Sequence, residues 1–416
     1  MKIKTVAVLG ANGTMGRNIA AIFASFGKAK VFLATRSLDK SKFALEKAYQ
    51  SVRCESIKER MVPVTYDDIQ TFIPECDLVF ESLKEDFDIK KDMYKRVIPF
   101  MKEDAILSTG TSGLSINELS VGRELYGIHM FNPPYNLSLC ELIGKDNPGL
   151  EQYLANVLKR TVVKVKDSPS FLGNRIGFYF INKAMELAEL NKDQGGVDYI
   201  DAIFGGFTGR SMSPLVTADF VGLDVHKSIV DYVYKNTADK AFICPDYLNA
   251  LVDNGYLGKK SEKGLYYYDK DRKLTFVYDI RDGKFRLKNE YNFYFSNKMI
   301  ELIQTGDYQK AYQLLIADEC VEAVICKTLL LEYIVYSLKT SLDVSDSISS
   351  CDDVMATGFS WIPPIALIEV FGGKDTVNDL VHQYLDADLI KTWDVLFDMV
   401  PNKSKYDYRT FLKGRY

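Results

Sequence analysis

The sequence predicts a doubly wound α/β sheet domain of the Rossmann type, followed by two related all-α domains. A glycine-rich turn joins an apolar strand to a helix at the N-terminus, and short apolar runs alternate with helical segments up to about residue 166. Beyond this point helical periodicity dominates, and one motif recurs at an interval of about 150 residues. Alternating strands and helices are typical of a parallel sheet, and a recurring motif indicates a duplicated unit.

The first strand, turn and helix open the predicted sheet domain. "KIKTVAVLG" (2–10) is apolar and β-branched, and "RNIAAIFASFG" (17–27) has the pattern of an amphipathic helix. "AKVFLATR" (29–36) then completes a strand–helix–strand unit. Further strands are predicted around four apolar runs, at Val79, Ile106, Ile128 and Val163.

The predicted domain boundaries follow the changes of pattern. The sheet domain is 1–166, the first helical domain 167–275, a linker 276–310 and the second helical copy 311–416. The segment around the linker is aromatic and charged, and its Asp-Gly pair is typical of a hairpin turn. The repeat aligns 205–224 with 357–375, through the pairs Gly206-Phe207 and Gly358-Phe359, Pro214 and Pro364, Asp219 and Glu369, Gly222 and Gly372.

Composition and charge exclude several classes of function. The chain has 416 residues, 47% of them apolar and 26% charged, with a net charge of -4. This is the composition of a globular protein without a cationic surface for nucleic acid or an anionic membrane. The seven cysteines include no C-x-x-C pair and no signal peptide is recognisable, so we expect reduced thiols, no metal site and a cytoplasmic location.

The glycine-rich turn "GANGTMG" predicts a dinucleotide-binding loop. Its glycines are spaced G-x-x-G-x-x-G rather than G-x-G-x-x-G, but the turn follows a strand and opens a helix, as the binding motif requires. Gly10 would form the tight turn, Gly13 would admit the pyrophosphate and Gly16 would let the helix pack on the strand, while the helix N-terminus binds the anion. The residues assigned to the cofactor here are Gly10, Asn12, Gly13, Thr14, Met15 and Gly16. The alternative is a turn without a ligand.

The end of the second strand indicates which dinucleotide binds. NAD enzymes carry an acid there for the adenosine ribose, whereas this sequence has Thr35, Arg36 and Ser37. An arginine and two hydroxyls suit the 2′-phosphate of NADP. Alternatively, Arg36 stacks on the adenine or faces solvent, so NAD and NADP both stay open as the cofactor.

A histidine and a glutamate form the candidate proton-transfer pair. His129 lies at the end of a predicted strand, and Glu141 follows after "NPP", which allows the chain to double back and bring the carboxylate to the ring. A carboxylate behind an imidazole fixes its tautomer and raises its basicity, so the pair can take a hydroxyl proton. His226 and His382 lie in helical segments and are interpreted as packing or surface residues.

Several motifs follow one another in order along the chain. They are "GANGTMGRNIA", "VFESLKEDFDIKKDMY", "LSTGTSGLSINELS", "GIHMFNPPYNLSLCELI", "VKDSPSFLGNRIGFYFINKAMEL" and "GYLGKKSEKGLYYY". Together they resemble the 3-hydroxyacyl-CoA dehydrogenase family, over residues 1 to about 270. The second helical copy resembles the duplicated C-terminal domain of longer members, including the dehydrogenase part of multifunctional β-oxidation proteins.

The resemblance implies a role for each matching residue. His129 would take the proton of the 3-hydroxyl while hydride leaves C3 for the nicotinamide, Glu141 would orient His129, and Ser112 and Asn174 would hold the substrate oxygens. The positions implied to contact the nicotinamide half of the cofactor are Glu85, Lys90 and Asn132, and Lys260 matches a weaker contact from the helical domain.

Simpler interpretations exist for some of these residues. Ser112 could cap the helix of "SINELS", where Ser115 and Glu118 also form a capping box, and Asn174 could be a turn residue. Glu85 and Lys90 could form a solvated helix face. Where relatives carry a second serine or an asparagine near Ser112, this chain has Gly110 and Gly113, which bears on the shape of the acyl pocket.

The implied activity is reversible hydride transfer between a 3-hydroxyacyl-CoA and NAD or NADP, giving a 3-ketoacyl-CoA, in fatty acid or short-chain acyl-CoA metabolism. Two alternatives stay open: a dehydrogenase of a small free β-hydroxy acid or carnitine-like substrate, and a non-catalytic NAD(P)-binding sensor. An acyl-CoA is the expected partner. The protein is expected to be a monomer whose second helical copy replaces a dimer partner, or a homodimer.

Overall fold

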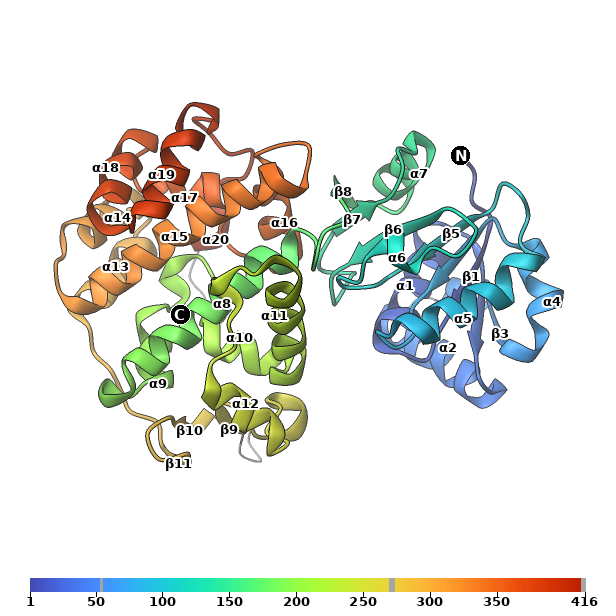
Figure 1. The fold of residues 1–416 in the computed structure, drawn as a ribbon, viewed down its shortest axis with the longest axis horizontal. Coiled ribbons are helices and arrows are strands. Elements are labelled where there is room, and N and C mark those ends of the chain that lie inside the picture. Colours follow the sequence, from blue (N-terminus) through green and yellow to red (C-terminus); the bar gives the residue numbers. More distant parts are fainter. Residues whose placement is uncertain (53–54, 269–273, 413–416) are drawn as a thin grey trace. The chain divides into compact units, whose positions relative to one another are not determined.

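A computed structural model describes residues 1–52, 55–268 and 274–412 of the chain. Contacts divide it into two compact units, Met1–Phe171 and Leu172–Tyr416 (Figure 1). Apart from residues 167–171, both predicted helical domains fall within the second unit. The described cysteines are all free, and Cys54 lies outside the described residues.

The first unit contains an eight-stranded sheet with the order β3-β2-β1-β4-β5-β6-β7-β8. Strands β1 to β6 are parallel, β7 runs antiparallel to β6, and β8 is parallel to β7. The strands are β1 Thr5–Leu9, β2 Lys30–Thr35, β3 Met61–Thr65, β4 Leu78–Glu81, β5 Ile106–Thr109, β6 Leu125–Met130, β7 Leu139–Ile143 and β8 Thr161–Lys164. The predicted Rossmann-type sheet domain is confirmed.

Helices connect these strands. They are α1 Thr14–Ser25, α2 Leu38–Val52, α3 Glu55–Lys58, α4 Ile69–Phe72, α5 Phe87–Val97, α6 Ile116–Leu119 and α7 Pro148–Gln152. Strands β1, β2, β4, β5 and β6 are parallel, so their carboxyl ends lie at the same edge of the sheet. The loops that follow these strands therefore lie at that edge, which is where ligands bind in such sheets.

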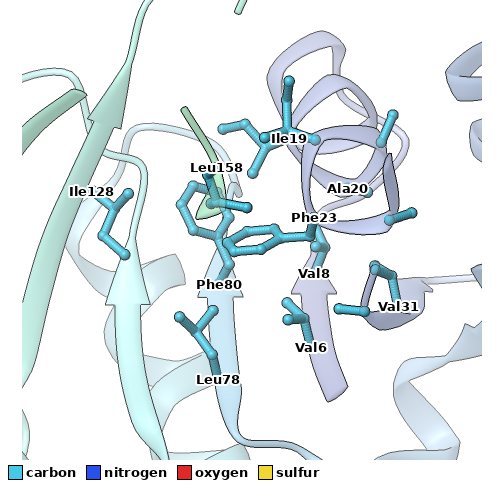
Figure 2. Close-up of a cluster of buried hydrophobic side chains, with 14 of the residues drawn as sticks. Val6, Val8, Ile19, Ala20, Phe23, Val31, Leu78, Phe80, Ile128 and Leu158 are labelled. Carbon is cyan, nitrogen blue, oxygen red and sulfur yellow. The ribbon is translucent and has the colours of Figure 1, made fainter. Parts of the chain in front are cut away.

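The core between α1 and the sheet fixes the position of the glycine turn. Figure 2 shows side chains of α1 packed on β1 and β4, with the Phe23 and Phe80 rings edge to face at 6.2 Å. Ile19 of the same helix is also buried, and Val8 lies beneath it on β1. Burial of this apolar face holds the N-terminus of α1 at the end of β1.

The second unit is mainly helical. Its helices are α8 Gly173–Leu190, α9 Val197–Ile203, α10 Pro214–Val221, α11 Leu223–Thr237, α12 Asp246–Asp253, α13 Tyr294–Gln304, α14 Tyr308–Ala317, α15 Val321–Val344, α16 Ser350–Val354, α17 Pro364–Val370, α18 Lys374–Tyr384, α19 Ala387–Leu396 and α20 Arg409–Leu412. Among the described residues, none of the helices combines the length and apolarity needed to cross a membrane.

A small antiparallel sheet interrupts these helices. It consists of β9 Tyr266–Tyr268, β10 Leu274–Asp279 and β11 Lys284–Leu287. The predicted hairpin is confirmed as β10 and β11, whose turn contains Gly283 with a φ of +71°. The proposed domain boundary at residue 275 falls within β10, and residues 269–273 of the hairpin segment lie outside the described residues.

The predicted repeat is visible in the structure. Pro214 and Pro364 each begin a short helix, and the glycines that follow these helices, Gly222 and Gly372, have φ values of +110° and +109°. The first turn of each short helix is also bound by a buried aspartate, Asp201 to the Leu215 N–H (2.8 Å) and Asp352 to the Ile365 N–H (2.9 Å).

The two copies pack on each other through their long helices, α8 and α15. The rings of Tyr179 and Tyr336 stack with centroids 3.7 Å apart, and those of Phe180 and Tyr333 meet edge to face at 5.6 Å. These shared aromatic contacts explain why the two helical segments form one compact unit.

Candidate active site

Two of the three glycines in the turn between β1 and α1 are required by the fold, because a side chain at either position would collide with the backbone. Gly10 has a φ of +81°, and a side chain there would collide with the Ser82 carbonyl of the neighbouring β4 loop. A side chain at Gly16 would collide with the carbonyl of Gly10, so this glycine lets α1 pack closely on β1. The hydroxyl of Tyr66 also accepts the Gly10 N–H at 3.0 Å.

Gly13 is different, because no contact among the described residues requires it to be glycine. Its φ is -67°, and an added Cβ would meet its nearest atom only at 3.4 Å. It is the residue before the first turn of α1, whose free N–H groups carry the positive end of the helix dipole. The missing side chain leaves room for an anionic ligand at this end of the helix, so the residues present fit a dinucleotide pyrophosphate.

The three residues after β2 have separate environments. Thr35 is buried, and its hydroxyl is held by the Ser37 carbonyl (2.8 Å) and the Ser41 hydroxyl (2.9 Å). Ser37 is half-buried and Arg36 is exposed. The Thr35 hydroxyl therefore shapes the turn, and the Arg36 guanidinium is the group that faces outward.

Arg36 lines two adjoining cavities. One, of about 270 Å³, is lined by the glycine turn together with Arg36, Lys40 and Lys84. The other, of about 420 Å³, lies between Leu83 and Met93 and contains charges of both signs. Arg36, Tyr66 and Leu83 line both cavities, which therefore lie next to each other at the ends of β1, β2 and β4.

His129 and Glu141 form a buried pair at the same edge of the sheet. They are directly opposite each other across the antiparallel strands β6 and β7, and His129 Nδ1 lies 2.7 Å from Glu141 Oε2. The predicted doubling back of the chain is confirmed, with a cis peptide at Asn132-Pro133 in the connection. Because Nδ1 faces the carboxylate, Nε2 is the nitrogen that can accept a proton from a substrate.

The loop after β5 carries Ser112 and is tied down by Glu85. The Glu85 carboxylate accepts the Ser112 N–H at 2.8 Å and the Thr111 hydroxyl. Ser115, not Ser112, caps α6 by accepting the Glu118 N–H, so the interpretation of Ser112 as a helix cap is wrong. Ser112 is exposed.

The glycines on either side of Ser112 are required by packing. A side chain at Gly110 would strike the ring of Phe80, and one at Gly113 would strike the backbone of Ser170. These two departures from the family pattern therefore follow from contacts inside the first unit.

Lys90 is buried in an ion-pair network, so its interpretation as part of a solvated helix face is wrong. Its side chain is 1% exposed, and Nζ lies 2.8 Å and 3.1 Å from the two oxygens of Glu81 and 3.2 Å from Glu85. Glu81 is fully buried and also accepts the hydroxyls of Tyr94 and Thr109, each at 2.7 Å. Burial beside the Glu81 carboxylate raises the pKa of Tyr94, which keeps this hydroxyl a donor.

Sequence reasoning missed Glu81, Tyr94 and Thr109. The available signal was a glutamate at the end of the apolar run "LVFE", where a charge requires a buried partner. The partner, Lys90, is nine positions away on α5, and only the fold brings the two together.

The remaining predicted residues lie in both units. In the first, the Asn132 side-chain carbonyl is 3.4 Å from the Asn18 amide of α1. In the second, Asn174 is the buried second residue of α8 rather than a turn residue, and Lys260 is half-exposed and pairs with Asp224.

The other two histidines differ from His129. His226 is fully buried, its Nε2 lies 3.2 Å from Asn182 Oδ1, and burial lowers its pKa to about 3. His382 is exposed and lies 3.1 Å from Asp394. In the part of the chain that the structure describes, no group of three or more His, Cys, Asp or Glu side chains could hold a metal ion.

The fold and the site define a class before any comparison is made. A classical parallel strand order, a glycine turn opening α1, and a buried imidazole–carboxylate pair at the same sheet edge are features of Rossmann-type oxidoreductases that use a nicotinamide dinucleotide. Residues 5–168 match the NAD binding domain of 3-hydroxyacyl-CoA dehydrogenase, and residues 171–268 match its C-terminal domain. The chain belongs to the 3-hydroxyacyl-CoA dehydrogenase family.

Individual relatives agree with this assignment. The 3-hydroxybutyryl-CoA dehydrogenase of Clostridioides difficile is 30% identical over 64% of this chain and 99% of its own length. A probable 3-hydroxyacyl-CoA dehydrogenase of Bacillus subtilis is 28% identical over 93% of this chain but 53% of its own length. The chain thus spans about half the length of the relatives that it matches over nearly all of its own sequence.

A solved structure covers the whole fold. The crystal structure of 3-hydroxybutyryl-CoA dehydrogenase from Escherichia coli K12 superposes with a TM-score of 0.72, over 96% of this chain and 99% of that one, at 20% identity. This likeness shows that a sheet domain followed by a long helical region is a fold shared with that protein.

Proposed function

We propose that this chain is a 3-hydroxyacyl-CoA dehydrogenase that interconverts 3-hydroxyacyl-CoA and 3-ketoacyl-CoA, with NAD or NADP as its hydride carrier. The observation that carries the proposal is the buried His129–Glu141 pair, 2.7 Å apart, at the same sheet edge as the glycine turn. A protein that only senses a dinucleotide has no need of a buried base at this position.

His129 would act as the base in the oxidative direction. Nδ1 is held by Glu141, so Nε2 accepts the proton of the 3-hydroxyl as the C3–O bond gains double-bond character and C3–H leaves as hydride. The Glu141 carboxylate stabilises the imidazolium that results. In the reductive direction the same imidazolium returns the proton to the ketone oxygen.

Ser112 would hydrogen bond the substrate oxygen and hold C3 in place. Its loop is restrained by Glu85, which accepts the backbone N–H of Ser112, and Glu85 is in turn 3.2 Å from the buried Lys90. Restraint of this kind favours a reactive geometry and contributes to the rate.

The nicotinamide group would supply the site that accepts or returns hydride. The residues that would hold the dinucleotide are those of the glycine turn, including Asn12, Thr14 and Met15, and the residues after β2. Glu85, Lys90 and Asn132 are proposed for its nicotinamide half, Lys260 for a weaker cofactor contact from the helical domain, and Asn174 for the substrate. Location in the cytoplasm stays a prediction.

The second helical copy supports a proposal about assembly. Because α8 and α15 already bury their aromatic faces on each other, the second copy would take the place of a dimer partner, and the protein would be a monomer. Light scattering after size exclusion tests this proposal, and a tight dimer through the α8 face would contradict it.

The test of activity is the reduction of acetoacetyl-CoA, followed by the loss of reduced nicotinamide absorbance with NADH and with NADPH. We expect turnover with acetoacetyl-CoA and little with free acetoacetate. Comparable turnover of the free acid would favour the alternative of a small β-hydroxy acid or carnitine-like substrate. Dinucleotide binding without turnover of either substrate would favour the sensor.

A further inference from the structure

We propose that Arg36 and Lys40 bind the 2′-phosphate of NADP(H) and make the protein prefer it to NAD(H). This inference rests on the proposed use of a nicotinamide dinucleotide. It identifies which dinucleotide the two cavities recognise and which residues recognise it.

The first observation is the charge of the smaller cavity. Its lining joins the glycine turn to the end of β2 and contains Arg36, Lys40 and Lys84 but no carboxylate. None of these three cations makes an ion pair with any residue that the structure describes. A concave site lined by three cations and no carboxylate favours a ligand that carries several negative charges.

The second observation is the contrast with the larger cavity, which shares Arg36. There two arginines, Arg36 and Arg96, are balanced by Asp67 and Asp92, and Leu83, Ile89 and Met93 provide apolar surface. A charge-balanced and partly apolar site suits the adenine ring. The phosphate groups of the ligand therefore belong in the smaller cavity, with Arg36 on the wall between the two.

The chemistry of Arg36 distinguishes the two dinucleotides. The adenosine ribose of NAD presents hydroxyl groups, which NAD enzymes bind with a carboxylate acceptor at this position. A guanidinium has five donors and no acceptor, so it cannot replace that carboxylate, whereas its fork of N–H groups matches the oxygens of a phosphate. With the Thr35 hydroxyl held by Ser37 and Ser41, Arg36 is the outward-facing recognition group of this turn.

Lys40 adds a second charge from the first turn of α2. This helix begins at Leu38, so Lys40 lies at the same terminus as the positive end of the helix dipole. Asp39, the acidic residue of the same turn, lines neither cavity. Arg36 and Lys40 therefore approach the ligand from two adjacent elements.

The experiment measures binding separately from turnover. The full chain is titrated with NADPH and with NADH, followed by the fluorescence of the reduced nicotinamide, and we expect tighter binding of NADPH by at least about tenfold, because charge-assisted hydrogen bonds to a phosphate are strong. Arg36→Ala and Lys40→Ala should each raise the NADPH dissociation constant by about 10- to 100-fold and change that for NADH by less than about threefold. Lys42→Ala removes an exposed lysine of the same helix that lines neither cavity, and should change neither constant.

Two results would overturn the proposal. One is equal or tighter binding of NADH by the unaltered protein, and the other is an equal loss of both dinucleotides in Arg36→Ala, which would mean that Arg36 acts on a shared part of the cofactor. Arg36→Asp restores an acceptor and should shift the preference toward NADH. Selective NADPH binding without turnover of acetoacetyl-CoA would reject the proposed function and leave this inference standing. Turnover of acetoacetyl-CoA with NADH alone would reject this inference and leave the proposed function standing.

Discussion

Two buried ionisable pairs lie at the same edge of the sheet of the first unit, and the proposed mechanism moves a proton through only one of them. His129–Glu141 joins β6 to β7 at 2.7 Å, and Lys90–Glu81 joins α5 to β4 at 2.8 Å. In the proposed mechanism the second imidazole nitrogen accepts the substrate proton, whereas Lys90 Nζ lies within 3.2 Å of oxygens of both Glu81 and Glu85.

This difference separates chemistry from positioning. Histidine is the side chain that gains and loses a proton near neutral pH, so a buried histidine with one carboxylate can serve as a base. Lys90, which lies between two carboxylates, holds the residues around it in place. The two pairs should therefore respond differently to substitution, which the following predictions use.

Replacement of His129 should have the largest effect. His129→Gln keeps a polar side chain of similar size but removes the base, so kcat should fall by about 10²–10⁴-fold, the usual contribution of general acid–base catalysis. Steady-state kinetics with acetoacetyl-CoA measure this fall, and nicotinamide fluorescence should show unchanged dinucleotide binding.

The control is His382→Gln, which alters an exposed histidine of the second unit. It should retain full activity. If His129→Gln kept the turnover of the unaltered protein, His129 would not be the base. The proposed difference between a proton-transfer pair and a positioning pair would then be wrong.

Replacement of Glu141 should have a smaller effect, because the base remains. Glu141→Gln can still contact the imidazole but cannot offset its positive charge, and we expect kcat to fall by about 10- to 100-fold, as for other partners that orient a histidine. Glu141→Asp should recover part of the loss if charge matters, and none if only the length of the side chain does. A variant with normal kcat would contradict the role given to Glu141.

Replacement of Glu81 tests the positioning pair. Glu81→Gln leaves the buried Lys90 with Glu85 as its single carboxylate partner in the described network, and breaking a buried pair costs about 3–5 kcal/mol of folding free energy. Because Glu85 also holds the Ser112 loop, kcat for the acyl substrate should fall by about tenfold while its KM changes little.

Denaturant unfolding and steady-state kinetics separate these two effects. Glu46→Gln, an exposed acid on α2, is the matched control and should change neither quantity. A loss of stability with unaltered kcat would make Glu81 a purely structural residue. Rescue of kcat by Glu81→Asp would support a role of its charge.

The sequence was sufficient to predict the groups whose position depends on local pattern. Each of these features depends on one contiguous stretch of sequence. They are the glycine turn, the strand that ends at Thr35, and the return of the chain from His129 to Glu141. Strands β3 and β7 were not predicted, because Pro63 interrupts one apolar pattern and Glu141 the other. Proline is tolerated in β3 since this strand lies at the edge of the sheet.

What could not be predicted depends on contacts between distant elements. The partners of Glu81 come from α5 and β5, and the cations of the smaller cavity come from the ends of β2, β4 and α2. Spacing along the chain carries no information about such contacts. The register of the sheet and the packing of α5 create them.

Asp219 of the second unit provides a third kind of buried carboxylate, without a cationic partner. It accepts the N–H groups of Leu265 and Tyr266, both at 2.8 Å, but burial dominates and raises its pKa to about 7, from an ordinary value of 3.8. A raised pKa means that the folded state holds this proton more tightly than the unfolded chain. The stabilisation is therefore complete below about pH 4 and is lost as the pH rises through 7.

The resulting prediction is the smallest of the series. The midpoint of thermal unfolding should fall by a few °C between pH 5 and pH 8, and Asp219→Asn should reduce this fall, because the amide does not titrate. Asp253→Asn, an exposed position on α12, should leave the fall unchanged. Equal falls in the Asp219 variant and the unaltered protein would show that another group is responsible. A reduced fall would show that a buried acid with only neutral donors behaves differently from Glu141 and Glu81, whose partners are an imidazole and an ammonium.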